Sequence, residues 1–180
     1  MKSSLFTKAL ILLTLCSFFI EQSKEQQESF SHLLGDYTVY AFLPSDKDGW
    51  IQSGLGTASF TPIFDSTYVV EKVFTDMGDW TLTMQNTFGI DKSSGKVKIF
   101  TIDKEFGTMD TYVGKMDKDR VSVNNLSSDS RFISPSGESL AFRLTYSKLN
   151  DESNQLIVES THDEGKSWIP YVKYIYQKRF

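Results

Sequence analysis

Apolar and polar residues alternate with a period of two along most of the sequence after Gly35. The two clearest runs are 80–90 and 138–148, in which large apolar side chains occupy nearly every second position. Their apolar members include Trp80, Leu82, Met84, Leu140, Phe142, Leu144 and Tyr146. Because successive side chains of a β-strand point to opposite faces, each run predicts a strand with one buried face.

Short segments rich in Asp, Asn, Ser and Gly separate the alternating runs, and their spacing predicts about ten strands. The expected strands are 36–43, 53–63, 66–75, 79–90, 96–103, 109–116, 119–126, 138–148, 154–162 and 167–179. Connections this short, with no long helix between them, indicate an antiparallel meander. A meander of this length avoids unpaired edge strands best by closing into a barrel. The predicted fold class is therefore all-β, a single closed antiparallel barrel.

The first residues are typical of an export signal. Lys2 and Lys8 precede an apolar run, 9–20, that is shorter than the roughly 20 residues of a membrane-spanning helix. We expect a signal peptide at 1–23, a polar lead-in with a short helix at 24–35, and the barrel domain at 36–180. The chain has a length suited to one domain, and we expect it to be periplasmic or secreted.

Cys16 is the only cysteine and lies inside the apolar run. We expect it to fill the signal peptide, with a lipid anchor at Cys16 as the alternative because "LTLC" loosely resembles a lipobox. The rest of the chain then has neither a disulfide nor a thiol nucleophile. The formal net charge is −4, and no cluster of Lys and Arg appears, so nucleic-acid binding is not expected.

Residues 161–168, "THDEGKSW", match the Asp-box pattern found in the blades of sialidase-type β-propellers. A propeller needs several repeats of about 40–45 residues, whereas this chain has one box and no internal repeat. We therefore interpret the box as a structural hairpin turn, with a carbohydrate or calcium site as the alternative. In that turn Asp163 accepts hydrogen bonds, Gly165 takes a positive φ, Ser167 bonds back to the loop and Trp168 packs over the hairpin.

Four segments in order, "LLGDYTV", "FGIDKSSGKVKIFTID", "FGTMDTYVGKMD" and "YVKYIYQKR", resemble the lipocalin-like, or calycin-like, domain family of exported bacterial proteins of unknown function. The resemblance covers roughly 33–179. Tyr37 stands where that family usually has Trp. The resemblance implies that Tyr37 and a basic residue of the last strand, Arg179, pack together at the closed end of the barrel.

The sequence has few groups suited to catalysis. Its two histidines, His32 and His162, lie far apart without cysteine partners, which does not make a zinc site. There is no Gly-x-Ser-x-Gly elbow, and the paired carboxylates fall mainly in turns. We expect no enzyme activity, no metal and no cofactor. His162 shares a face of the predicted strand 154–162 with Leu156 and Val158, so a haem-binding barrel that uses His162 remains an alternative.

Aromatic residues make up 14% of the chain and either fill the barrel or line a cavity in it. We expect a cavity that binds a small, mostly apolar molecule. The predicted ligand-binding residues are Trp80, Leu82, Met84, Phe142, Leu144, Tyr146 and His162. A filled barrel that acts as a surface for protein interaction is the other alternative, and the sequence names no protein partner.

The terminal Phe180, with Tyr174 and Tyr176 before it, also fits an outer-membrane β-barrel. Against this interpretation, the runs "VVEKVF" and "KVKIF" place charges on both faces of their strands or next to apolar positions. A Lys or Arg that faces lipid at mid-depth costs about 2–4 kcal/mol. We therefore expect no membrane span in the mature chain.

Overall fold

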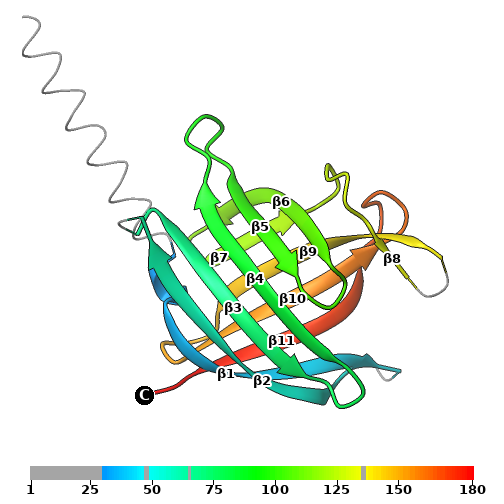
Figure 1. The fold of residues 1–180 in the computed structure, drawn as a ribbon, viewed down its shortest axis with the longest axis horizontal. Helices are drawn as coiled ribbons and strands as arrows, with labels where there is room; N and C mark the ends of the chain where they lie inside the picture. The colour runs from blue at the N-terminus through cyan, green and yellow to red at the C-terminus, as the bar shows by residue number, and fades with distance from the viewer. Residues whose placement is uncertain (1–29, 47–48, 65, 135–136) are drawn as a thin grey trace, which may run out of the picture.

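The computed structural model describes residues 30–46, 49–64, 66–134 and 137–180, and the predicted signal peptide with Cys16 lies outside them. A 3-10 helix, η1 (Ser31–Leu33), precedes the strands. The strands are β1 (Gly35–Ser45), β2 (Gly49–Ile63), β3 (Tyr68–Asp76), β4 (Thr81–Ile90), β5 (Val97–Asp103), β6 (Thr108–Asp117), β7 (Arg120–Asn124), β8 (Phe132–Ile133), β9 (Ser139–Lys148), β10 (Ser153–Thr161) and β11 (Ile169–Lys178). Figure 1 shows them wound into one barrel.

The strands close into an antiparallel barrel. Each strand from β1 to β6 pairs with the next, β7 pairs with β9, β9 with β10, β10 with β11, and β11 returns to β1. The two-residue β8 adds to the edge of β9. The predicted all-β barrel is confirmed, and all ten predicted strands are present. The sequence did not predict β8, because two residues are too few for an alternating pattern.

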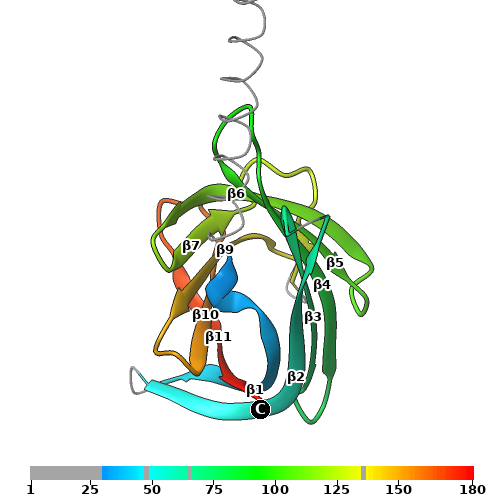
Figure 2. The ribbon, with the colours of Figure 1, turned by 90° about the vertical axis from the view of Figure 1, so that its left-hand side faces the viewer.

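One half of the barrel is filled with side chains. η1 brings Phe30 and Leu33 into the lumen, where both are almost completely buried. The ring of Phe30 lies 5.9 Å from that of Phe88 in an edge-to-face contact, and Phe60 lies 6.0 Å from Phe88. Figure 2 shows η1, in blue, inside the ring of strands. The helix expected within 24–35 is thus a single turn that caps this end.

The alternation of the sequence sets which side chains point inward. In β5, Val97, Ile99, Thr101 and Asp103 are buried while the residues between them are exposed. In β4, Leu82 and Phe88 are buried and Thr81 is exposed, as the sequence predicted. No helix among the described residues has the length and apolar composition to cross a membrane.

Candidate ligand-binding cavity

A cavity of about 700 Å³ occupies the other half of the barrel. Residues from nearly every strand line it, whereas Phe30, Phe60 and Phe88 of the packed half do not. Trp80 and Phe106 lie outside the strands, Phe132 lies in the short β8, and together they mark its mouth. The barrel is therefore neither wholly filled nor wholly open.

The structure brings together all the predicted ligand-binding residues except one. The lining of the cavity includes Trp80, Leu82, Met84, Phe142, Leu144 and Tyr146. Trp80 is 43% exposed at the mouth, and Tyr146 is 1% exposed at the deep end. Strands β4 and β9, which are separated in the chain, contribute facing parts of the same cavity.

His162 is the exception, since it is exposed and does not line the cavity. The inward phase of Leu156 and Val158 holds only while the strand continues, and β10 ends at Thr161. His162 instead begins the turn that follows. The structure thus corrects its assignment as a ligand-binding residue and gives no inward ligand for haem at this position.

Tyr37 and Arg179 are not brought together either. The Tyr37 ring is buried and makes edge-to-face contacts with Phe60 and Tyr176, at 5.7 and 6.0 Å. The cross-strand partner of Tyr37 is Lys178. The next residue, Arg179, therefore faces away from the ring; it is exposed, and its backbone N–H donates to the carbonyl of Asp36. At the closed end, the Tyr37 hydroxyl donates to the Leu33 carbonyl at 2.9 Å instead.

A buried carboxyl group separates the packed half from the cavity. Glu71 of β3 is fully buried, and its Oε2 accepts hydrogen bonds from Asn86 Nδ2 at 2.7 Å and from the Tyr146 hydroxyl at 2.9 Å. Its Oε1 accepts from the Tyr176 hydroxyl at 2.8 Å. Burial raises the pKa of the Glu71 carboxyl, and the hydrogen bonds oppose that rise without cancelling it. Asn86, Tyr146 and Tyr176 line the cavity, so this cluster forms its floor.

Glu71 belongs to a row of inward polar residues. Strand register places it opposite Asn86, Asn86 opposite Thr101, and Thr101 opposite Asp110. The charges of "VVEKVF" argue in the sequence only against a lipid-facing strand, and this row was not predicted. The signal was present, since Glu71 is in phase with the buried Val69 and Val73.

Two atoms in this row have no hydrogen-bond partner among the described residues, Asn86 Oδ1 and Thr101 Oγ1. One step nearer the mouth, Asp103 is 8% exposed, and its Oδ1 accepts from the Phe106 N–H at 2.9 Å. Burial raises the pKa of the Asp103 carboxyl, which backbone N–H groups partly oppose. Burial also raises the pKa of the Tyr112 hydroxyl, with Asp110 and Asp103 adding to the shift.

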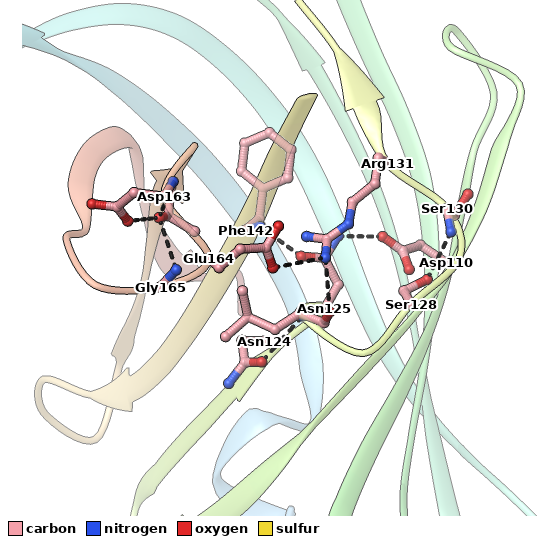
Figure 3. Close-up of polar contacts among 12 residues, drawn as sticks. Asp110, Asn124, Asn125, Ser128, Ser130, Arg131, Phe142, Asp163, Glu164 and Gly165 are labelled. Carbon is pink, nitrogen blue, oxygen red and sulfur yellow. Dashed lines mark hydrogen bonds and ion pairs between the residues drawn. The ribbon is translucent and has the colours of Figure 1, made fainter. Parts of the chain in front are cut away.

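The mouth is organised by the segment between β7 and β9, whose polar contacts Figure 3 shows. Asn125 is 1% exposed; its Nδ2 donates to Asp110 Oδ2 at 2.5 Å and its Oδ1 accepts from the Phe142 N–H at 2.6 Å. Arg131 donates to the Leu126 carbonyl at 2.7 Å. These bonds hold the segment that carries β8 against the cavity.

Aromatic rings form the rim. The ring of Phe132 lies 5.1 Å from that of Phe106 and 5.9 Å from that of Phe142. Phe142 in turn lies 5.2 Å from Tyr171. A molecule that enters the cavity therefore passes a chain of aromatic side chains.

The Asp-box forms the turn between β10 and β11. Asp163 accepts hydrogen bonds from the Thr161 hydroxyl at 2.7 Å and from the N–H and hydroxyl of Ser167 at 2.9 and 2.6 Å. These bonds, chiefly from the Ser167 hydroxyl, hold the pKa of the Asp163 carboxyl well below its usual range. Gly165 has a φ of 82°, and the Arg143 guanidinium lies over the Trp168 ring at 4.6 Å.

The box also contacts the mouth. Glu164, at its centre, forms an ion pair with Arg131 at 3.5 Å, as Figure 3 shows. Arg131 lines the cavity, whereas the Asp-box residues themselves do not. The turn therefore supports the segment at the mouth from outside the cavity. Among the described residues, no group of three or more His, Cys, Asp or Glu side chains is arranged to hold a metal ion.

No protein-family model matches the chain, and no curated protein does. Among solved structures, the chain is similar to EF1p2_mFAP2b bound to DFHBI, with 8% identity and a TM-score of 0.43. The alignment covers 86% of this chain and 99% of that one. The ten-stranded antiparallel barrel itself fits a calycin-like fold.

Proposed function

We propose that the protein binds a small, mostly apolar molecule inside the barrel and does not act as an enzyme. The observation that carries this proposal is the cavity of about 700 Å³ above the Glu71 cluster. Its size is within the range of roughly 300–1,000 Å³ that is usual for small-molecule sites. Most lining residues are apolar or aromatic, which suits a ligand that is itself mostly apolar.

The carboxyl groups near the cavity have structural partners, which supports the non-catalytic part of the proposal. Glu71 accepts three hydrogen bonds and does not line the cavity. Asp103 caps the turn after β5, and Asp110 holds Asn125. A pair of carboxyl groups for general acid–base work needs one of them free to reach a substrate. Here each of these carboxyl groups already accepts a hydrogen bond within the barrel.

Binding can be measured with the emission of Trp80, which lies at the mouth. Titration with the apolar dye N-phenyl-1-naphthylamine should enhance dye fluorescence with a micromolar dissociation constant and change the tryptophan emission. Replacing Trp80 by Phe should remove most of the change in tryptophan emission. Replacing Trp168, which packs under Arg143 away from the cavity, should leave it intact. If neither this dye nor retinol binds, the lumen is not a ligand site and the interaction-surface alternative takes its place.

We also propose that the protein is exported. Lys2 and Lys8 before an apolar run support this proposal. N-terminal sequencing of the protein recovered from its native host should find a start near Lys24. A mature protein that retains Met1, or one lipidated at Cys16, would replace this proposal with a cytoplasmic or anchored location.

A further inference from the structure

Most of the polar groups of the cavity lie on one wall. Strands β4 to β6 contribute the polar and acidic members, namely Asn86, Thr101, Asp103, Thr108 and Asp110. The wall formed by β9 to β11 contributes mainly apolar and aromatic side chains, including Leu144, Leu156, Val158, Val172 and Tyr174. A ligand that fits both walls has an apolar body and a polar group at one position.

The free atoms on the polar wall favour a hydrogen-bond donor. Asn86 is 2% exposed, and its amide nitrogen already donates to Glu71, so its Oδ1 is the atom left without a partner in the described part of the chain. Thr101 is 4% exposed, and its hydroxyl has no partner among the described residues. A buried polar group that stays unpaired costs free energy, which a ligand recovers by bonding to it. The amide oxygen can only accept, so the matching ligand group is N–H or O–H.

The charge of the lining favours a cation over a neutral donor. The residues that line the cavity include three carboxyl groups, those of Asp103, Glu105 and Asp110, and one guanidinium group, that of Arg131. Arg131 already donates to the Leu126 carbonyl and pairs with a glutamate outside the cavity. A positive group on the ligand therefore offsets an excess of negative charge on the lining, and water screens this charge poorly at the buried Asp103.

We propose that the cavity takes an apolar molecule with a protonated amine, and that the ammonium group sits against Asn86, Thr101 and Asp103. An ammonium group offers up to three donors and no acceptor, which matches an amide oxygen, a hydroxyl and a carboxylate. A carboxylate head group would meet acceptors and like charges on the same wall. This inference rests on the proposed function and narrows its ligand class from apolar molecules in general to apolar amines.

Three probes with the same alkyl chain separate the possibilities: decylamine, decan-1-ol and decanoic acid. We expect decylamine, measured by displacement of N-phenyl-1-naphthylamine near neutral pH, to bind at least about tenfold tighter than decan-1-ol. Decanoic acid should bind most weakly. Equal affinities, or tightest binding of decanoic acid, would overturn the inference while leaving the proposed function intact. Absence of binding by all three and by the dye would instead remove the proposed function.

Asp103→Asn tests the position of the ammonium group, with Asp91→Asn as the matched control. Both carboxylates accept from a backbone N–H at 2.9 Å in the turn after a strand, but Asp91 does not line the cavity. Asp103→Asn should reduce the preference for decylamine over decan-1-ol by about tenfold, and Asp91→Asn should leave that preference unchanged. An unchanged preference in both variants overturns the assignment.

Thr101→Val gives a second test that does not alter a turn. It replaces a hydroxyl that has no partner in the described structure by a methyl group of similar shape, so the fold should be kept. Binding of decylamine should weaken several-fold, while binding of the dye, which carries no ammonium group, should stay the same. An equal loss of affinity for the dye and for decylamine would mean that Thr101→Val changes the shape of the cavity and does not remove a contact with the ammonium group.

Discussion

At the scale of single residues, Glu71 is the most constrained group in the barrel. A carboxyl group removed from water is costly unless donors surround it, and three donors from β4, β9 and β11 do so. The same bonds orient Asn86 and Tyr146 toward the cavity. Glu71 therefore shapes the floor of the cavity without lining it.

The pH dependence of stability should report the burial of Glu71. Its pKa in the folded protein is raised above the ordinary value of 4.5. Below pH 4.5 the carboxyl is mainly protonated in both states, and its contribution to stability is fully present. As the pH rises from 4.5 toward the folded-state pKa, only the unfolded chain gives up the proton, so this contribution is lost.

Glu71→Gln removes this titration without changing the size of the side chain. The difference in free energy of unfolding between the wild type and Glu71→Gln should decrease as the pH rises above 4.5. Urea denaturation at a series of pH values measures it. Because both proteins keep all other carboxyl groups, their titration cancels in the difference. A difference that does not change with pH would mean that Glu71 titrates alike in both states.

Alternation in the sequence predicted six of the apolar or aromatic residues that line the cavity, but none of its polar ones. Trp80, Leu82 and Met84 follow from alternation alone. Glu71 and Asn86 share that inward phase, yet a polar residue at an inward position has no preferred interpretation until its partners are known. Those partners, Tyr146 and Tyr176, come from strands far along the chain, and their approach depends on barrel closure.

At the scale of elements, two short segments shape the mouth of the cavity. The Asp-box keeps its predicted turn bonds, and Glu164 adds an ion pair that spacing could not predict. The segment after β7 is anchored by Asn125, which bonds to both Asp110 and Phe142. The sequence predicted a strand over 119–126, but β7 ends at Asn124, and Asn125 anchors the segment that follows instead.

Asn125→Ala should loosen the mouth, and the adjacent Asn124→Ala is the control. Asn125 is 1% exposed, and its loss leaves Asp110 and the Phe142 N–H short of a partner, which should cost about 1–3 kcal/mol. Within the described ranges, the Asn124 side chain accepts only from the Leu126 N–H, at 3.2 Å, so its replacement should cost less than about 1 kcal/mol. Hydrogen exchange should speed up across 126–134 in the Asn125 variant alone. Equal protection in both variants would mean that other contacts hold the segment.

At the scale of the whole molecule, the barrel divides into a packed half and an open half. Alternation and turn spacing predicted the closed barrel, because both are local properties of the chain. They did not predict the division, since inward aromatic residues look the same whether they fill space or line it. The position of η1 makes the difference, because Phe30 and Leu33 fill the lumen at one end only.

The same substitution should therefore have different consequences in the two halves. Phe88 is completely buried against Phe30, Phe60 and Tyr146, so Phe88→Ala should destabilise the protein by about 3–5 kcal/mol. Phe142 is only partly buried and already borders the cavity. Phe142→Ala removes fewer close contacts and should cost clearly less than Phe88→Ala.

The effects on ligand binding should have the reverse order: Phe142→Ala should change binding, and Phe88→Ala should not. A ligand that binds only the folded state stabilises it by an amount that grows with the ratio of its concentration to its dissociation constant. If Phe88→Ala still folds, N-phenyl-1-naphthylamine should raise its melting temperature about as much as that of the wild type. The gain should differ in Phe142→Ala, because that change alters the cavity itself. Equal destabilisation of both variants, with equal stabilisation by the dye, would mean that the lumen packs uniformly. The division into a packed half and an open half, and the ligand site that depends on it, would then be wrong.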